Sequence, residues 1–358
     1  MSNRASPQSL RHIAIRKEIL HVTPHATNLR GNNRWTAVAV PVLLLVHWAI
    51  AAAVGQSNFI ICFVSALFIG QIIIHQAGTL LHETAHRLVF HNARAKLLFD
   101  LGLEIILASY SKQLTYQYEH VTSHHAHLGD YENDYEHEDI CHLTARTLVK
   151  TKFAWSQRVI TWATLLLHAL PLGFLISGEV MPRIYEFFSS VKSKDDTRHI
   201  RSRKVPVRLR ILFIVVSTTS NFTLYFFFGG IALLYHVWSL SLFLSKFGVT
   251  NLGQSLSEHE GDNPSHPTYS DYRFTNLLLF NTGYHNEHHT FPDVAWVNLP
   301  RLKKLSPKHF SRENPRSYFA LWLRHIAQDF SPTRVSNVAP SAIAEKCGAA
   351  KALIIEPS

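Results

Sequence analysis

The sequence predicts an all-α integral membrane protein with about four transmembrane helices in two hairpins and a helical cap on the cytoplasmic side. Two long uncharged stretches carry this prediction, because neither residues 35–82 nor residues 211–245 contain any Asp, Glu, Lys or Arg. Each stretch is long enough for two spans, since a helix crosses the bilayer core with about 20 apolar residues. Charged residues make up only 17% of the 358-residue chain, against roughly 25% in an average soluble protein.

Turn residues divide each uncharged stretch into two parts. A polar turn at residues 55–58 divides the first stretch, and the pair Gly229 and Gly230 divides the second. The predicted spans are residues 36–54, 59–76, 211–228 and 231–247. Both outer turns are short and uncharged, so the charged residues collect on the opposite side. An excess of Lys and Arg marks the cytoplasmic side of a membrane protein, and we therefore expect both termini there.

Residues 159–178 are also uncharged, but Pro171 interrupts them. The following segment, residues 179–210, carries nine Lys and Arg residues. A single crossing by residues 159–178 would place these positive charges outside, against the positive-inside rule. We therefore expect residues 159–178 to form a membrane-surface or half-inserted hairpin.

The remaining chain divides into terminal segments around one membrane domain. Residues 1–34 are basic and expected in the cytoplasm, residues 35–330 form the membrane domain, and residues 331–358 are expected to be a disordered tail rich in Ala, Ser and Pro. The net charge of +10 comes from basic segments beside the spans, so it does not indicate nucleic-acid binding. The C-terminal sequence is no retrieval signal for the endoplasmic reticulum, which favours a multi-pass protein of a bacterial inner membrane.

Histidine is unusually abundant, with 24 copies, and it gathers in three clusters outside the predicted spans. The first cluster is residues 82–86 (HETAH), directly after the second span. If the helix continues, His82 and His86 lie on one face at i and i+4, where two imidazoles can hold one metal ion.

The second cluster is residues 119–125 (EHVTSHH). Helical spacing places His120 and His124 on one face, while His125 is turned by about 100° and could reach a second metal ion. The third cluster, residues 285–289 (HNEHH), repeats this spacing at i, i+3 and i+4. A ninth candidate ligand, His259, follows the fourth predicted span.

Eight or nine neutral imidazoles suit two transition-metal ions. Imidazole binds iron, copper, zinc and nickel, so the ligand type leaves the metal open. Carboxylates commonly orient metal-bound histidines, and the candidates are Glu83, Glu119, Glu258, Glu287, Asp130 and Asp134. For histidines outside the clusters, including His12, His47, His75 and His236, we expect surface or packing roles.

Two other classes of protein could explain part of this pattern. Residues 82–86 also match the HExxH motif of zinc proteases, with Glu83 as the base. A single zinc site needs three protein ligands and would leave the other two clusters unexplained. A metal transporter would place its histidines along a path through the bilayer, whereas the clusters lie outside the predicted spans.

The clusters HxxxH, HxxxHH and HxxHH, separated by paired spans, resemble the three histidine boxes of the membrane fatty acid desaturase/hydroxylase superfamily. Residues 283–292 (GYHNEHHTFP) are especially similar to the sphingolipid 4-desaturase branch, and so are residues 124–139 (HHAHLGDYENDYEHED). Residues 119–125 together with residues 257–259 (SEH) also resemble the alkane hydroxylases. The resemblance covers about residues 35–330.

The chain departs from the sphingolipid branch at three places. The second box of that branch is HxxHH, one residue shorter than the cluster here. Gln254 stands where the branch has a histidine, and Thr290 replaces an acidic residue after the third box. No HPGG haem motif is present, so the resemblance implies that electrons arrive from a separate protein.

The resemblance implies a non-haem centre of two iron ions (Fe²⁺) at the cytoplasmic boundary, with O2 as co-substrate. In this family, removal of two hydrogens gives a double bond, and transfer of oxygen gives an alcohol. The ligands implied are His82, His86, His120, His124, His125, His259, His285, His288 and His289.

The activity expected from the resemblance is desaturation of an acyl chain or a similar unactivated C–C unit. Hydroxylation is the alternative within the superfamily, as is desaturation of a small secondary metabolite, such as an amino acid of the rhizobitoxine type with an enol-ether double bond. The expected partners are the membrane, a lipid or small amphiphilic substrate, and a ferredoxin or cytochrome b5 type of electron donor with its reductase. The basic cytoplasmic face would attract an acidic donor.

Overall fold

The computed structural model describes residues 5–129, 133–134, 149–150, 154–176, 205–259, 268–330 and 353–354. The described part is almost entirely helical, which confirms the all-α prediction. Its strands are β1 (Val149–Lys150) and β2 (Leu353–Ile354), two residues each, which pair in parallel. Asp130 and most of the predicted tail, residues 331–358, lie outside the described residues.

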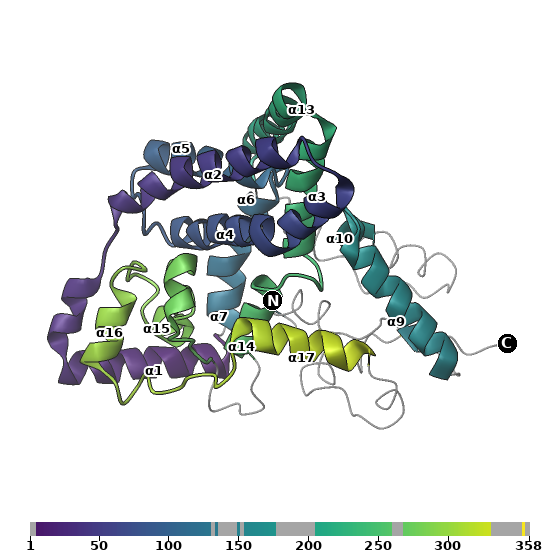
Figure 1. Cartoon of the computed structure of the whole chain (residues 1–358). Coiled ribbons are helices and arrows are strands. Elements are labelled where there is room, and N and C mark those ends of the chain that lie inside the picture. Colours follow the sequence, from purple (N-terminus) through teal and green to yellow (C-terminus); the bar gives the residue numbers. More distant parts are fainter. Residues whose placement is uncertain are drawn as a thin grey trace.

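Three helical stretches are long and apolar enough to cross a membrane. The first, Arg34–Val54, contains α2 (Ala39–Val54), and the second, Phe59–Ala85, contains α3 (Phe59–Ser65) and α4 (Gln71–Ala85). A π-helical turn, η3 (Ala66–Gly70), joins α3 to α4. The third is α13 (Val207–Phe243). Figure 1 shows α2, α3 and α13 in the upper part of the molecule.

The structure has three such stretches among its described residues instead of the four predicted spans, because two of the predicted spans fall within α13. Helix α13 is interrupted at Gly229, where φ is 85° and ψ is 179°. Residues before the break pack on α5 (Ala93–Leu107), where Ser220 Oγ donates to the Ile105 carbonyl at 2.7 Å. Residues after the break pack along α3 and η3. The predicted turn at Gly229 is therefore present as a sharp bend.

The bend packs closely on the turn between α2 and α3. A Cβ atom at Gly55 would lie 2.6 Å from the Phe228 carbonyl oxygen and 3.2 Å from the Ala232 Cβ. Only glycine permits this approach without a shift of the backbone. The two predicted turn regions of the sequence, residues 55–58 and the Gly229 bend, thus lie side by side.

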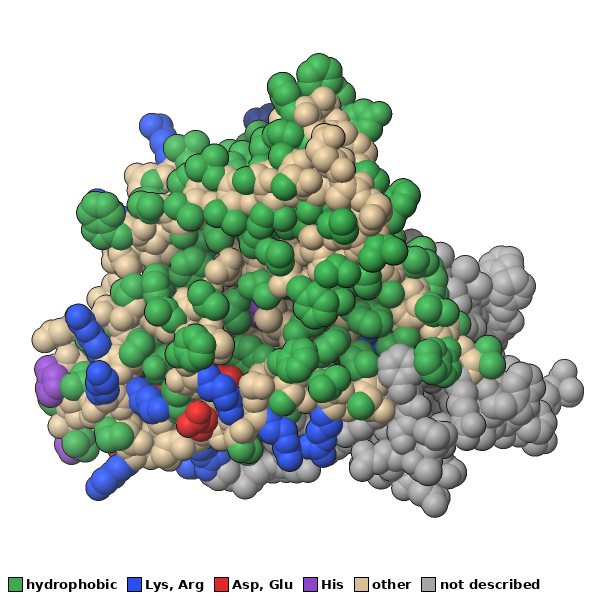
Figure 2. Space-filling model, viewed as in Figure 1, with side chains coloured by type: hydrophobic (Ala, Val, Ile, Leu, Met, Phe, Trp, Pro, Cys, Tyr) green, Lys and Arg blue, Asp and Glu red, His purple; other side chains and the backbone are tan. Residues whose placement is uncertain are grey.

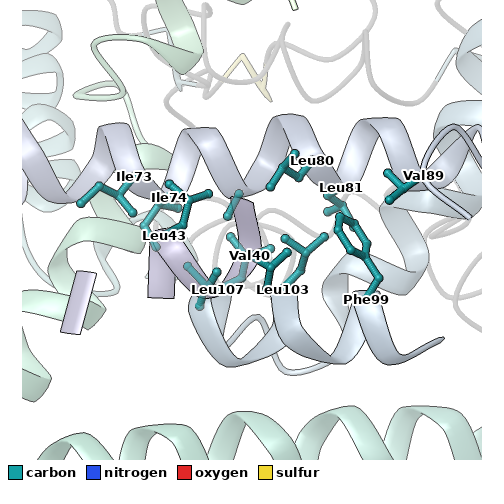
Figure 3. Close-up of a cluster of buried hydrophobic side chains, with 12 residues drawn as sticks. Val40, Leu43, Ile73, Ile74, Leu80, Leu81, Val89, Phe99, Leu103 and Leu107 are labelled. Carbon is teal, nitrogen blue, oxygen red and sulfur yellow. The ribbon is translucent and has the colours of Figure 1, made fainter. Parts of the chain in front are cut away.

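Apolar side chains of α2, α4 and α5 interlock in a core that lies beside the first histidine cluster (Figure 3). Val40 and Leu43 from α2 meet Ile73, Ile74, Leu80 and Leu81 from α4 and Phe99, Leu103 and Leu107 from α5. Hydrophobic side chains also cover the outer surface of the upper part, whereas most Lys and Arg on the visible face lie along the lower edge (Figure 2). This division is typical of a membrane domain with a charged cap.

The cap is built from helices that come from the N-terminal segment, from residues 112–127 and from the part of the chain after α13. Helix α1 (Pro7–Val22) runs along its lower side and contacts α7 and α15 (Figure 1). The other cap elements are η1 (Pro24–Leu29), α6 (Lys112–Glu119), η4 (His120–His124), α7 (His125–His127), α14 (Asn251–His259), α15 (His285–Thr290), α16 (Leu299–Leu305) and α17 (Tyr318–Phe330). Helix η2 (Arg34–Val38) begins the first apolar stretch, and η6 (Phe274–Leu279) lies beside α4.

The expected hairpin at residues 159–178 is partly described. Helix α9 (Ala154–Ala169) ends before Pro171, and the chain turns before the short helix α10 (Gly173–Leu175). The predicted interruption at Pro171 is therefore confirmed. Trp162 and Leu166 are exposed on α9, a pattern consistent with a helix on a membrane surface.

Candidate metal centre

The first histidine cluster lies where α4 leaves the membrane domain. His82 is in the last turn of α4, and His86 caps the helix, so their rings lie one above the other with centroids 5.3 Å apart. The hydroxyl of Thr84, between them, donates to Asp100 of α5 at 2.8 Å. Lys96 binds the same carboxylate at 2.6 Å. The hydrogen bond between Thr84 and Asp100 joins α4 to α5 and so helps to set the direction of both imidazoles.

The second cluster adopts a π-helical turn, η4, which changes the predicted pairing of its histidines. The N–H of His125 donates to the carbonyl of His120, five residues earlier. In a π-turn, residues i and i+5 share a face. His120 and His125 therefore meet, with their Nε2 atoms 3.2 Å apart. The sequence-based pairing of His120 with His124 is wrong, because it assumed an α-helical turn.

The third cluster forms the short buried helix α15. His285 and His289, at i and i+4, have ring centroids 4.4 Å apart. His288 points elsewhere, toward the first two clusters, where its ring centroid lies 4.1 Å from that of His82 and its Nε2 lies 3.1 Å from the Nε2 of His125. In the third cluster, His285 and His289 thus point to one side and His288 points to another.

The three clusters combine into two adjoining groups of imidazoles. The larger group contains His82, His86, His120, His125 and His288, and the smaller one contains His124, His285 and His289. Within each group one ring nitrogen per residue lies within 4.8 Å of the others. The rings of His125 and His289 stack with centroids 4.3 Å apart and so join the two groups.

The electrostatics of the groups favour neutral rings. Burial lowers the pKa of His86 to about 4, and neighbouring histidines add to this effect. Burial likewise holds the pKa values of His120, His125, His288 and His289 well below the usual range. A neutral imidazole offers one lone pair, and the buried Nε2 of His86 has no hydrogen-bond partner among the described residues. Converging lone pairs without donors between them fit metal ions.

Two carboxylates at the edge of the smaller group orient its rings. Nδ1 of His124 lies 2.9 Å from Oδ1 of Asp134, which is completely buried. Nδ1 of His285 lies 3.4 Å from Oε2 of Glu258. A proton held on Nδ1 by a carboxylate leaves Nε2 free as a ligand. The two sequence-based candidates Asp134 and Glu258 are thus next to the rings that they were expected to orient.

Two further candidate carboxylates, Glu287 and Glu83, accept hydrogen bonds from groups other than the imidazoles. Glu287 accepts hydrogen bonds from Ser270 Oγ at 2.7 Å and Tyr272 OH at 2.8 Å, and burial raises its pKa to about 7. Since Ser270 Oγ also accepts from the Asn286 N–H, Glu287 shapes the α15 turn. Glu83 is buried and accepts from the Trp296 N–H at 3.2 Å.

The remaining three expected residues are Glu119, His259 and Asp130. Glu119 is half-buried at the end of α6. His259 ends α14, but its side chain lies outside the described part of the structure, as does the whole of Asp130.

One residue of the site was not expected from the sequence. His12 of α1 is buried, its Nδ1 lies 2.8 Å from Thr290 Oγ1, and its ring centroid lies 5.5 Å from that of His289. Beside it a cavity of about 150 Å³ reaches both imidazole groups. The cavity is lined by Ser9, His12, Ile13, Arg16, His125, Leu128, His289, Thr290 and Pro292. His12 has no other histidine at helical spacing in its basic segment, so the sequence pattern did not indicate a role for it at the site.

Helix α1 is fixed over the centre by ion pairs. Asp293, just after the third cluster, binds Arg16 of α1 at 2.8 Å and also binds Arg30. The guanidinium of Arg16 also lies 5.0 Å from the centroid of the Phe291 ring. The N-terminal helix therefore closes the side of the centre that faces away from the spans.

Comparison with known proteins agrees with this arrangement. A model of the fatty acid desaturase family matches residues 57–322. This chain belongs to the fatty acid desaturase family. The match spans all three histidine clusters and confirms the resemblance seen in the sequence.

Curated relatives cover most of the chain. Sphingolipid delta(4)-desaturase DES1 of Mus musculus is 28% identical over 330 residues, which cover 89% of this chain and 87% of the relative. The DES1 protein of Drosophila melanogaster is 29% identical, with coverage of 84% and 83%. A Caenorhabditis elegans protein described as both sphingolipid delta(4)-desaturase and C4-monooxygenase is 23% identical, with coverage of 84% and 74%.

Membership in this family makes the chain an oxidoreductase of the desaturase/hydroxylase type. The family implies a metal-dependent oxygenase reaction, and the two imidazole groups can bind metal. The family match together with the apolar helices indicates a membrane protein. The HExxH protease interpretation of residues 82–86 is not supported, because His82 and His86 lie in a group with three histidines of the other clusters.

Proposed function

We propose that this protein is an O2-dependent, non-haem di-iron desaturase that introduces a double bond into the acyl chain of a lipid. The observation that carries the proposal is the pair of adjoining imidazole groups, five rings in one and three in the other, at the end of an apolar helix. The ligands we propose are His82, His86, His120, His125 and His288 for one ion, and His124, His285 and His289, with His259, for the other.

The chemistry requires a buried centre with fixed ligands. Two Fe²⁺ ions, when bound, would supply the reduction of O2 that allows hydrogen to be removed from an unactivated carbon. The protein holds the rings in place through Asp134 and Glu258, and the π-turn at residues 120–124 aims neighbouring histidines at different groups. Helix α1 covers the side of the centre opposite the spans and lines the cavity that reaches both imidazole groups.

The reaction needs a source of electrons. Forming one double bond with O2 takes two electrons and two protons from outside the substrate and releases two molecules of water. We propose a ferredoxin or cytochrome b5 type of donor with its reductase, which would approach the cap. Lys and Arg along the lower edge of the molecule (Figure 2) suit an acidic partner.

The membrane arrangement we propose has four spans and both termini in the cytoplasm. Helix α13 contains 37 residues and would be about 55 Å long if straight, far more than the roughly 30 Å of a bilayer core. The bend at Gly229 lies beside the α2–α3 turn, so both would face the same outer side. The bacterial inner membrane is the location that we propose.

The substrate proposed for testing first is a sphingolipid-type amide, because the relatives are sphingolipid delta(4)-desaturases. Hydroxylation is the second candidate activity, favoured by the C4-monooxygenase description of the Caenorhabditis elegans relative. The two activities differ in the mass of the product, so one experiment can separate them.

The test is expression of the wild type, His288→Ala and His21→Ala in a host with an electron-donor system. His288 belongs to the larger imidazole group, whereas His21 is exposed on α1. A product lighter by two hydrogens supports a desaturase if it is present in lipid extracts of the wild type and of His21→Ala. The same product should be absent from extracts of His288→Ala. One added oxygen identifies a hydroxylase. Purified wild type with a single zinc ion per chain in place of two irons would refute the proposal.

A further inference from the structure

The helix η6, which precedes the third histidine cluster, carries large apolar side chains on an exposed face. Phe274 is 87% exposed, Leu277 63% and Leu278 57%. Thr275 is exposed beside them, whereas Asn276 and Leu279, three residues apart, are buried. Because a 3₁₀-helix repeats every three residues, this alternation defines one buried edge and one continuous apolar face. An exposed apolar face of this kind indicates a partner or a lipid.

The position of η6 along α4 indicates that it lies at membrane depth. The Gln76 side chain of α4 donates from Nε2 to the Leu278 carbonyl at 2.8 Å. Gln76 precedes His82 by six residues, which is about 9 Å along the helix axis, and it lies within the apolar stretch Phe59–Ala85. The end of η6 therefore contacts α4 at a point nearer the middle of this apolar stretch than His82.

Several backbone groups of η6 are hydrogen-bonded within the segment, which favours contact with lipid. The N–H groups of Asn276, Phe280 and Asn281 bond to carbonyls of η6 and its N-cap. The Asn276 side chain donates to the Asp271 carbonyl at 2.8 Å and accepts from the Gly283 N–H at 2.8 Å. These bonds tie both flanks of η6 together without the help of solvent.

The charge at the edge of this face suits the headgroup boundary. Arg273, which caps η6, is held by Asp271 at 2.9 Å and by the carbonyls of Asn314 and Arg316. Through these bonds the start of η6 is joined to the segment before α17. That helix exposes Phe319 and Leu323, one turn apart. Arginine next to exposed apolar side chains is typical of elements that lie in a membrane interface.

We propose that η6 is embedded in the cytoplasmic leaflet and forms the entrance through which a lipid-borne acyl chain reaches the metal centre. The segment that carries η6 returns to the third cluster, because the Asp271 N–H donates to the Gly283 carbonyl at 2.7 Å, two residues before His285, so a chain that leaves the bilayer here would arrive beside that cluster. The inference rests on the proposed function for its substrate, but the lipid contact of η6 stands independently of turnover.

The first experiment measures lipid contact. Leu277→Cys and Lys304→Cys are labelled with a fluorophore in a background where Cys62, Cys141 and Cys347 are replaced. The labelled chains are placed in nanodiscs of equal parts phosphatidylcholine and phosphatidylglycerol that contain a lipid with a nitroxide near the start of its acyl chain. We expect several-fold stronger quenching at position 277 than at position 304, which is exposed on the cap. Equal quenching, as a second copy or another protein over η6 would give, overturns the proposal.

The second experiment tests the entrance. The variant Phe274→Ser/Leu277→Ser/Leu278→Ser is compared with Leu98→Ser/Val207→Ser, whose residues are 71% and 69% exposed on α5 and α13. In nanodiscs we expect KM for a bilayer-borne substrate to rise about tenfold in the η6 variant, with kcat and bound iron preserved, since only binding is weakened. An unchanged KM, or the same rise in the control, refutes the entrance. Absence of any product from the wild type would instead refute the proposed function and leave the quenching result valid.

Discussion

Two sets of buried histidines in this protein differ in what their nitrogen atoms face. In the cap, eight rings converge in two groups with carboxylates at the edge. Within the membrane domain, His47 of α2 and His236 of α13 hydrogen-bond to each other, with Nε2 and Nδ1 2.9 Å apart, and the described residues offer no third imidazole there. His47 and His236 are buried, as are five of the eight rings in the cap, and the other three are half-buried. Burial alone therefore does not distinguish a metal ligand from a packing histidine.

The number of rings and their partners distinguish the two sets. Metal sites of this kind need at least three protein ligands, and the cap offers that number in each group. The pair of His47 and His236 forms one hydrogen bond between helices, which is the usual role of polar side chains inside a bundle. The comparison leads to four expected outcomes, given from the largest effect to the smallest.

The largest effect is expected for His125→Ala. This ring lies between His120 and His288 and stacks on His289, so its loss removes a ligand and the contact between the groups. We expect activity to fall by more than about hundredfold, because even loss of a residue that only orients a ligand costs up to that much. Bound iron, measured by elemental analysis, should fall as well. His127→Ala, on the same short helix but in neither group, should retain both iron and activity.

A smaller effect is expected for Asp134→Asn. The amide cannot hold the proton of His124 Nδ1 as a carboxylate does, so the ring loses part of its orientation. We expect iron affinity to fall by about tenfold, measured by competition with a chelator. Glu18→Gln serves as the control, because Glu18 is exposed and contacts only His309 in the described structure. Equal loss of affinity in both variants would contradict an orienting role for Asp134.

For His236→Leu we expect a loss of stability without a loss of metal. Removing one ring leaves His47 without its partner between two helices, which costs about 1 kcal/mol in a membrane bundle. Thermal unfolding in detergent should record this loss while the iron content stays constant. The double variant with His47→Leu should recover part of the stability, since no buried polar ring is left unpaired. Loss of iron in either variant would place this pair in the metal centre.

The smallest effect is expected for deletion of Thr122, an exposed residue of the π-turn. The deletion converts EHVTSHH into the HxxHH spacing of the sphingolipid branch. After the deletion, the first and last histidines of the cluster are four residues apart, and an α-helical turn places them on one face. In the π-turn of the wild type, the same two histidines are five residues apart and share a face. Iron content should therefore be preserved, as measured on purified protein. A loss as large as that of His125→Ala would show that the extra residue has another role.

The sequence predicted those parts of the site that depend on local spacing. The i and i+4 pairs His82 with His86 and His285 with His289 follow from α-helical geometry, and both are present. The grouping of His120 with His125 could not be predicted from the spacing. It depends on a backbone hydrogen bond between residues five apart, where an α-helix would bond residues four apart. The contribution of His12 depends on how α1 packs on α15, a tertiary contact between residues far apart in the chain.

The fold, too, could be predicted from the sequence only where it depends on local features. Hydropathy and turn residues located the apolar stretches and the Gly229 bend, because both depend on composition within a short window. They did not show that the bend packs on Gly55, nor that η6 lies beside α4 at Gln76. Such contacts between distant segments depend on side-chain complementarity, which a single sequence does not display.

The ion pair between Arg16 and Asp293 has a consequence for biosynthesis. Residue 16 leaves the ribosome early, and its partner leaves after four-fifths of the chain has been made. Contacts of such long range form late, because the loop between them must close first. The third histidine cluster leaves the ribosome only a few residues before Asp293. The imidazole groups and the docking site of α1 are therefore completed at almost the same time, after both apolar stretches of the N-terminal half and α13 have been made.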